Sequence, residues 1–313
     1  MRRTCLQTIR DLARDDSRVV FIGSDITKRD LGAFAAEFPE RYFAEGIYEE
    51  HLVGMAAGLA LSGKIPYINT IATFLTRRCY EQIVLDLGLH DVPVRLIGSG
   101  GGTVYAPLGA THITIDDFAV LRVIPNMTII AVCDAEEMKR LMPQTLDWPH
   151  PIYIRLAKGG DEVVSSNAHP FQIGKAIPMR HGHDALIIST GVATQVAIKS
   201  ADVLNNQGVS VSVLHVPTVK PLDTEAILAH VAEVPVVVTV EEHRIVGGLG
   251  SAVSELIAEN RFDGQKRFRR VGFPDVFTEE HGSQSLIMEK YGITPENLVS
   301  QIVEMTHAET DAL

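Results

Sequence analysis

Short runs of β-branched and apolar residues alternate with helical segments along the whole chain, and this alternation constrains the fold more than any other feature. Runs such as 18–23, 92–97 and 127–132 are apolar over most of their length instead of alternating with polar residues. Strands of this kind are buried on both faces, which is typical of parallel sheets covered by helices. Helical segments such as 4–13 and 49–61 lie between them. The sequence therefore predicts an α/β fold with mainly parallel sheets.

The alternation is interrupted once, between residues 158 and 183. This stretch is polar and rich in turn-forming residues, with only short ordered structure expected. Beyond it the strand and helix pattern resumes and continues to a closing helix at 295–307. A length of 313 residues suits two domains, since a domain typically has about 100–200 residues. We therefore expect an N-terminal domain, a linker and a C-terminal domain at 1–160, 161–180 and 181–313.

Charge and apolar content argue against several classes of protein. The net charge is −11, from 39 acidic and 28 basic residues, and such a chain repels the phosphates of nucleic acids. No run approaches the roughly 18 consecutive apolar residues of a membrane span, and the charged N-terminal segment lacks the apolar core of a signal peptide. Cys5, Cys79 and Cys133 show no CxxC spacing, as in reduced intracellular proteins. We therefore expect a cytoplasmic protein without a nucleic-acid or membrane partner.

Two glycine-rich runs follow predicted strands. The run GSGGG at 98–102 lacks the GxGxxG spacing of a dinucleotide-binding loop, and no helix opens after it. We interpret it as a mobile or tightly turned active-site loop. The run GGLG at 247–250 does open a helix. There we favour close packing of the backbone at a contact between domains or subunits.

Two carboxylates begin the strongly apolar helix predicted at 49–61. Glu49 and Glu50 would interact favourably with the helix dipole, so simple capping is one interpretation. The helix is apolar almost all round, and it carries Gly54 and Gly58 four residues apart. Small residues at this spacing allow another backbone to approach closely. A second interpretation therefore places one acid of the pair at a subunit interface.

Two further polar residues lie next to a turn and a strand end. His112 closes the segment Gly109–His112, and a lone histidine is more often structural than catalytic. Arg155 ends an apolar strand, where an exposed charge is common. Strand ends in open α/β sheets also bind ligands. Structural and functional roles therefore stay open for both residues.

Taken in order, these segments resemble the transketolase family of thiamine diphosphate enzymes. In the first half of the chain, the matching segments are IGSDIT at 22–27, GIYEEH at 46–51, MAAG at 55–58, ATFLTRRCYEQI at 72–83 and GATH at 109–112. In the second half, they are VKPLD at 219–223, TVEEH at 239–243 and GGLGS at 247–251. The ordered set spans nearly the whole chain and is most similar to the separate C-terminal subunit of a split transketolase.

This resemblance implies a pyrimidine-binding domain followed by the transketolase C-terminal domain. The diphosphate-binding domain of the family carries a Gly-Asp-Gly motif with a metal-ligating asparagine, and these 313 residues contain no such motif. The resemblance therefore implies that Mg²⁺ and the diphosphate of the cofactor are held by a second polypeptide, and that this chain supplies no metal ligand. The implied assembly is an α2β2 heterotetramer, with self-association through both domains of this chain.

The resemblance also implies roles for individual residues. Glu49 matches the glutamate that hydrogen-bonds the aminopyrimidine ring of thiamine diphosphate, so that the 4′-nitrogen of the ring can take the proton from C2; Glu50 aligns less well. A buried carboxyl group suits this task, because burial favours the protonated form. His112 matches a histidine that contacts oxygens of the donor. The other implied contacts are to the cofactor at Asp25, Ile26, Phe74 (stacked on the pyrimidine), Arg78 and Tyr80, and to the substrate at Ser99 and Arg155.

The sequence departs from the sugar-phosphate members of the family near the donor. Their His-Asp pair in the loop after the strand ending at Ile97 is replaced by Ser99–Gly101, and one of their acidic residues corresponds to Leu108. A site that hydrogen-bonds a hydroxyl group rejects substrates that lack it. We therefore expect a relaxed hydroxyl requirement, more room beside this loop, and anion recognition by Arg155 and Arg77.

The resemblance implies that this subunit serves a thiamine diphosphate-dependent transketolase, which moves a two-carbon ketol unit from a ketose to an aldehyde in carbohydrate metabolism. Close alternatives are a decarboxylating carboligase similar to deoxyxylulose phosphate synthase and the β subunit of a 2-oxoacid dehydrogenase. A non-catalytic paralogue that only completes a complex would have lost the acid at position 49, and Glu49 is present. A nicotinamide-dependent dehydrogenase is disfavoured because the dinucleotide fingerprint is missing.

Overall fold

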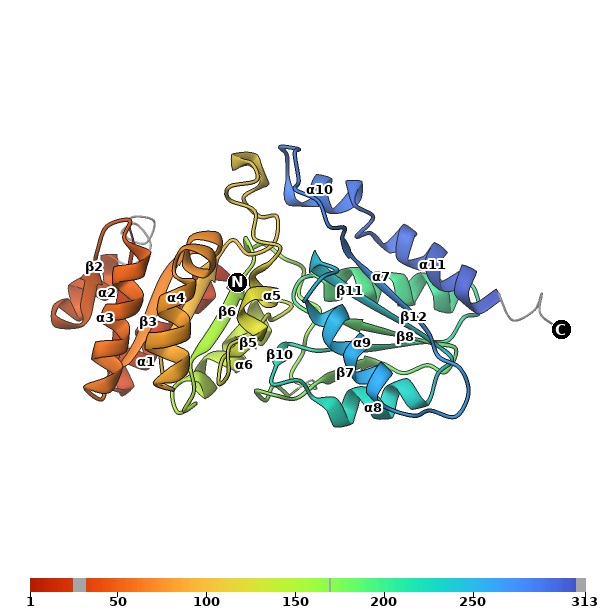
Figure 1. The fold of residues 1–313 in the computed structure, drawn as a ribbon, viewed down its shortest axis with the longest axis horizontal. Coiled ribbons are helices and arrows are strands. Elements are labelled where there is room, and N and C mark those ends of the chain that lie inside the picture. The colour runs from red at the N-terminus through yellow and green to blue at the C-terminus, as the bar shows by residue number, and fades with distance from the viewer. Residues whose placement is uncertain (25–31, 169, 308–313) are drawn as a thin grey trace.

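The computed structural model describes residues 1–24, 32–168 and 170–307, which form two α/β domains side by side (Figure 1). The predicted α/β class with mainly parallel sheets is confirmed. The N-terminal domain consists of α1 (Arg2–Asp15), β1 (Val19–Gly23), α2 (Gly32–Glu37), η2 (Pro39–Arg41), β2 (Tyr42–Ala44), α3 (Glu49–Leu61), β3 (Ile65–Ile71), η3 (Phe74–Arg78), α4 (Tyr80–Gln82), η4 (Ile83–Leu89), β4 (Arg95–Ser99), η5 (Ala106–Leu108), α5 (Asp117–Arg122), β5 (Thr128–Ile130), α6 (Ala135–Leu141), η6 (Met142–Thr145) and β6 (Ile152–Leu156).

The C-terminal domain has the same layered construction. It consists of β7 (Ile177–Arg180), β8 (Ala185–Ser189), α7 (Ala193–Asn206), β9 (Val211–His215), β10 (Thr218–Lys220), α8 (Thr224–Ala232), β11 (Val236–Arg244), α9 (Leu249–Glu259), β12 (Arg267–Phe273), α10 (Gln284–Lys290) and α11 (Pro295–His307). Its sheet has the order β12-β11-β8-β9-β7, and only the pair β7–β9 is antiparallel. Helices α8 and α9 pack on one face of this sheet, and α7 and α11 pack on the other.

The sheet of the N-terminal domain is buried on both faces, as its continuous apolar strands predict. Its order is β10-β5-β6-β4-β3-β1-β2, and every pair except β10–β5 is parallel. Consecutive residues of a strand point to opposite faces. One face packs against α3, η4 and α5 through residues that include Ile22, Ile68 and Leu96. The other packs against α1 and α6 through residues that include Phe21, Tyr67 and Ile97.

The two domains are joined by more than a linker. Strand β10 belongs to the C-terminal half of the chain, yet it pairs with β5 and completes the N-terminal sheet. One apolar core also runs without a break from α1 and α6 to α7 and α11. Between β6 and β7 the described residues contain no helix or strand, and β7 begins at Ile177, inside the stretch predicted as the linker.

The inner strand β3 is not among the strands that the apolar pattern predicts. Pro66 interrupts its apolar run near the start, and Asn69 and Thr70 interrupt it near the end. By contrast, the predicted helix 49–61 and α3 have the same bounds. No helix that the structure describes is long and apolar enough to cross a membrane.

Candidate functional site

The first residue of α3 is a buried acid. Glu49 is 1% exposed, whereas Glu50 beside it is exposed to solvent. The Thr70 hydroxyl donates a hydrogen bond to Glu49 Oε1 at 3.4 Å, and Ser24 donates in turn to the Thr70 hydroxyl at 3.1 Å. Arg78 Nη1 donates to Glu49 Oε2 at 2.7 Å. A buried carboxylate with two polar partners is more than a helix cap, because a carboxylate exposed to solvent would serve capping equally well.

The segment η3 places an aromatic ring and a cation beside this acid. It is a π-helical turn, a form found frequently at functional sites. Phe74 and Arg78 are four residues apart and share one side of the turn, so that the guanidinium carbon lies 4.7 Å from the centre of the Phe74 ring. The Arg78 side chain is 38% exposed. Arg78 therefore covers the ring and neutralises Glu49 from the solvent side.

His112 also contacts the Phe74 ring. The two ring centres are 5.1 Å apart, with the rings edge to face. The Thr111 hydroxyl is 2.9 Å from His112 Nδ1, and the His112 amide donates to the Gly109 carbonyl at 3.0 Å. The structure thus brings together four residues that the sequence analysis names: Glu49, Phe74, Arg78 and His112.

Ser99 is not part of this cluster. Its hydroxyl accepts a hydrogen bond from Asn69 Nδ2 at 2.9 Å, and its side chain is fully buried. Asn69 precedes Thr70 in β3, so its side chain points to the opposite face of the sheet. The expectation that Ser99 contacts substrate therefore draws no support from its placement.

Arg155 lies at the boundary between the domains, bound to Asp117. Its Nε donates to Asp117 Oδ2 at 2.8 Å, its Nη2 donates to Asp117 Oδ1, and its Nη1 donates to the carbonyl of Glu242 at 2.7 Å. Desolvation opposes ionisation of Asp117, but the charge and hydrogen bonds of Arg155, together with His243 and the Tyr153 hydroxyl, hold the pKa of Asp117 below its ordinary value. The protein itself occupies these donors, so the placement of Arg155 gives no support to anion recognition.

The remaining residues named from the sequence are placed differently. Asp25 and Ile26 lie outside the described residues. Tyr80 begins α4 and packs, half-buried, against the core beneath α3. Arg77 donates to Asp116 at 2.9 Å and to the carbonyl of Ile113 at 3.1 Å, so its cation is paired within the protein.

Sequence reasoning missed two threonine contacts near the site. Thr70 supplies the hydroxyl beside Glu49, and Thr73 is hydrogen-bonded to Thr114 next to the turn that carries His112. Both threonines follow the apolar start of β3. Ligands bind at the carboxyl edge of an open parallel sheet. If β3 had been predicted as a strand, the position of Thr70 and Thr73 at its carboxyl end would therefore have made both threonines candidates.

The glycine-rich run after β4 is a tight turn packed against side chains of both domains. Within Gly100–Gly102, the first and last residues have φ angles of +73° and +69°, which favour glycine. Cβ atoms added at the three positions would lie 2.1, 2.2 and 2.3 Å from atoms of Tyr105, Arg155 and Glu242. The tightly turned interpretation is therefore confirmed. The expectation of more room beside this loop is wrong, because these side chains fill the space.

The second glycine-rich run does lie at a contact between domains, as predicted. A Cβ atom on Gly247 would lie 2.5 Å from the Cβ atom of Ala119 in α5. The Gly247 carbonyl accepts a hydrogen bond from Arg122 Nη1 at 3.0 Å. The carboxylate of Glu241 accepts hydrogen bonds from the first amides of α9. The run therefore fixes α9 against the N-terminal domain.

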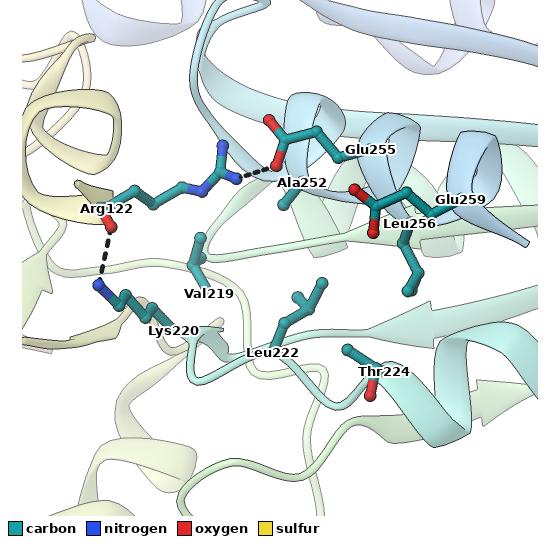
Figure 2. Close-up of a pocket in the computed structure, with 9 residues that line it drawn as sticks. All are labelled: Arg122, Val219, Lys220, Leu222, Thr224, Ala252, Glu255, Leu256 and Glu259. Atoms are coloured by element: carbon teal, nitrogen blue, oxygen red, sulfur yellow. Dashed lines mark hydrogen bonds and ion pairs between the residues drawn. The ribbon is translucent and has the colours of Figure 1, made fainter. Parts of the chain in front are cut away.

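A cavity of about 300 Å³ at the same boundary is a second candidate site. Its cations already have partners within the protein: Arg122 pairs with Glu255 at 2.5 Å, and Lys220 Nζ donates to the Arg122 carbonyl at 2.8 Å (Figure 2). Burial lowers the pKa of Lys220. Because these charges are already paired, they are poorly available to bind a ligand. The cluster at α3 is therefore the stronger candidate. The lining residues are Arg122, Val219, Lys220, Leu222, Thr224, Ala252, Glu255, Leu256 and Glu259.

A third group, Cys133, Glu137 and His215, has possible metal-ligand atoms within 4.8 Å of one another. Internal hydrogen bonds already use Glu137 Oε2 and both ring nitrogens of His215. Glu137 Oε2 accepts from the Cys133 amide at 2.6 Å and lies 3.0 Å from His215 Nε2, and His215 Nδ1 lies 2.8 Å from the Thr194 hydroxyl. Desolvation opposes ionisation of Glu137, but its contacts with His215 and Cys133 together hold the pKa of Glu137 below its ordinary value. We interpret the group as a buried polar link between the domains.

Comparison with known proteins agrees with the geometry at α3. The family model described as the pyrimidine binding domain of transketolase matches residues 1–160, and the model for the transketolase C-terminal domain matches residues 174–298. A solved structure described as a split gene transketolase in an inactive beta4 tetramer is similar at a TM-score of 0.88 and 32% identity. The match covers 97% of each chain.

Two curated relatives differ in how much of their length the chain matches. The chain is 34% identical over 307 residues to the 6-deoxy-6-sulfo-D-fructose transketolase subunit SqwH of Clostridium sp. (strain MSTE9), covering 98% of this chain and 94% of that protein. It is 38% identical over 293 residues to the 1-deoxy-D-xylulose-5-phosphate synthase of Symbiobacterium thermophilum, covering 93% of this chain but 44% of that protein. The first match extends over nearly the full length of both chains.

Proposed function

Because this chain belongs to the transketolase family, we propose that it is one subunit of a thiamine diphosphate-dependent enzyme that moves a two-carbon ketol unit from a ketose to an aldehyde. The observation that carries the proposal is that Glu49 is buried and that Arg78, its ion-pair partner, contacts the Phe74 ring. An aminopyrimidine ring needs an acid that exchanges a proton with a ring nitrogen and a flat apolar surface to stack on. Glu49 and Phe74 supply both.

The residues present fit the pyrimidine half of this cofactor. Thiamine diphosphate, when bound, supplies the nucleophilic carbon of the reaction. Glu49 would hold a proton at the pyrimidine nitrogen, and Thr70 would fix the other oxygen of its carboxylate. Phe74 would bear the ring once Arg78 moves aside. Since the Arg78 side chain is 38% exposed, it has solvent to move into. His112 would then donate to an oxygen of the substrate beside Phe74.

The diphosphate and Mg²⁺ are assigned to a second polypeptide. These 313 residues contain no Gly-Asp-Gly motif, and one full-length relative is itself described as a transketolase subunit. An α2β2 assembly would complete two such sites. The split-gene neighbour is described as inactive when it forms a tetramer of β chains alone, which supports the need for the second subunit. A role in carbohydrate metabolism and a cytoplasmic location remain predictions.

We predict that the chain alone has no ketol transfer activity and binds thiamine diphosphate weakly. Its residues contact only the pyrimidine half of the cofactor, and the anionic half would be left in water. Adding the diphosphate-binding subunit should restore activity and bring both chains into one species. Coupled activity assays and sedimentation of the mixture test this. Full turnover by the isolated chain would contradict the division of the site between two polypeptides.

We also predict that the preferred donor is not xylulose 5-phosphate. In place of an acid found in the sugar-phosphate members, the chain has Leu108, which is 56% exposed on the turn before His112. A leucine cannot bond a donor hydroxyl group, so the penalty for donors without that hydroxyl disappears. A panel of ketoses and sulfonated or phosphorylated analogues, assayed with both subunits present, tests this. If xylulose 5-phosphate has by far the highest kcat/KM, the substitution at this position does not set specificity.

A decarboxylating carboligase is the second candidate, favoured by the 38% identity to a 1-deoxy-D-xylulose-5-phosphate synthase. The two reactions differ in their donor, since a carboligase takes pyruvate and releases CO₂. The same two-subunit assembly should therefore be supplied with pyruvate, with and without an aldehyde acceptor. Release of CO₂ and formation of a new ketose would favour the carboligase. Transfer from ketoses alone would favour the transketolase.

A further inference from the structure

A loop of the C-terminal domain reaches the turn that carries His112. This loop, residues 274–283 between β12 and α10, projects on the same side of the molecule as the golden segment around η5 (Figure 1). A Cβ atom on Gly109 would lie 2.8 Å from Cε1 of His281, and all three nearest atoms to it belong to that ring. The imidazole of His281 therefore rests directly on the backbone of the Gly109–His112 turn.

The same loop is tied to η3 by a second path. Arg244, at the end of β11, donates from Nη2 to the Val276 carbonyl at 3.2 Å, and its guanidinium lies 5.4 Å from the centre of the Phe277 ring. Its Nη1 lies 3.9 Å from Asp116, which accepts from Arg77 of η3 at 2.9 Å. The loop is thus connected to both elements that hold the site, the turn with His112 and the π-helical segment with Phe74.

Contact with the turn fixes where the His112 ring lies. Gly109 has a φ angle of +83°, and its carbonyl accepts the His112 amide at 3.0 Å, which closes the turn. A shift of the turn away from His281 would move His112 with it. The Thr111 contact and the Phe74 ring orient the imidazole only while the turn stays in place. The position of His112 therefore depends on a residue in the other domain.

We propose that His281 is a positioning residue, through which the C-terminal domain holds His112 against Phe74 in the candidate active site. The proposal rests on the proposed function for the role of His112, but the contact between His281 and the turn stands without it. The contact that links His281 to the described cluster is the one with Gly109 in the turn. Replacing His281 should therefore lower activity only when His112 is present.

A double-mutant cycle in the two-subunit assembly tests this dependence. His281→Ala should lower kcat/KM for the donor about tenfold, since small displacements of a substrate contact cost this much or more. In the background of His112→Ala, the same change should have almost no further effect. His281→Gln, which keeps much of the contact with Gly109, should recover part of the loss. His183→Ala is the control, because His183 is 81% exposed in the same domain. Equal losses in both backgrounds would overturn the proposal.

A readout without activity separates this proposal from the proposed function. In the full chain labelled with ¹⁵N-histidine, the ring signals of His112, assigned with His112→Gln, should shift in His281→Ala and stay unchanged in His183→Ala. If the signals shift but the two-subunit assembly transfers no ketol unit, the positioning role is upheld and the proposed function is refuted. Unshifted signals would overturn the positioning role, whatever the assembly catalyses.

Discussion

Replacing Glu49 with glutamine should abolish ketol transfer by the two-subunit assembly while leaving the fold intact. The change is nearly isosteric, so the contact with Thr70 can remain, but the amide cannot exchange a proton with the pyrimidine ring. Loss of one acid–base group typically costs about 10²–10⁴ in rate. The Arg78 side chain is 38% exposed, so its cation stays solvated when the charge of Glu49 is removed, and the fold can persist. Exchange of the C2 proton of bound thiamine diphosphate, followed by NMR in D₂O, measures the step directly.

The matched control for this experiment is Glu50→Gln. Glu50 is in the same first turn of α3 but is exposed, so it can contribute only through the helix dipole. Its replacement should leave proton exchange within about twofold and thermal stability within ~0.5 kcal/mol, as for most surface substitutions. If proton exchange falls strongly in Glu50→Gln and little in Glu49→Gln, the acid that serves the pyrimidine ring is Glu50 and not Glu49.

The elements with continuous apolar patterns could be predicted from sequence, because such patterns report burial directly. Helix α3 is the best example: its run from Glu49 to Leu61 is interrupted by nothing but glycine and one histidine after its acidic start. Strand β3 could not be predicted in the same way. Its Pro66 and its polar carboxyl end are accommodated by pairing with β1 and β4 on either side, which is a tertiary effect.

The site divides along a similar line. Glu49, Phe74, Arg78 and His112 could be found because each lies in a segment whose spacing resembles the family, and the fold brings them together. The direction of a strand residue cannot be read from such spacing, and Ser99 therefore turned out to point to the other face of the sheet.

The partners of a buried cation are also hidden from sequence. Arg155 looks like an exposed charge at a strand end, yet Asp117, 38 residues earlier in the same domain, lies against it. Pairing of this kind depends on how β6 and α5 pack, not on any local motif. The difference matters for function, because it decides whether Arg155 is available to a substrate anion.

Replacing Asp117 with asparagine should destabilise the chain strongly at neutral pH. Both partners of the ion pair with Arg155 are buried, so the variant leaves a buried cation without its counter-charge, at a typical cost of about 3–5 kcal/mol. The pH dependence has a defined sign. The native pKa of Asp117 lies below its ordinary value of 3.8, so its stabilisation is complete above that value and is lost as the pH falls through the native pKa. The difference between variant and parent in urea unfolding should therefore be largest at neutral pH and shrink in strong acid.

The outcome decides between two roles for Arg155. Glu304→Gln is the matched control, because its pair with Arg269 has side chains that are 40% and 68% exposed, and such pairs contribute about 0–1 kcal/mol. If Asp117→Asn is destabilising and Glu304→Gln is mild, Arg155 is committed to the junction between the domains. If instead Asp117→Asn is as mild as the control, and Arg155→Met raises the KM only for anionic donors, the arginine is available to substrate. The junction would then be held by the shared core and by the pairing of β10 with β5, both of which persist without the ion pair.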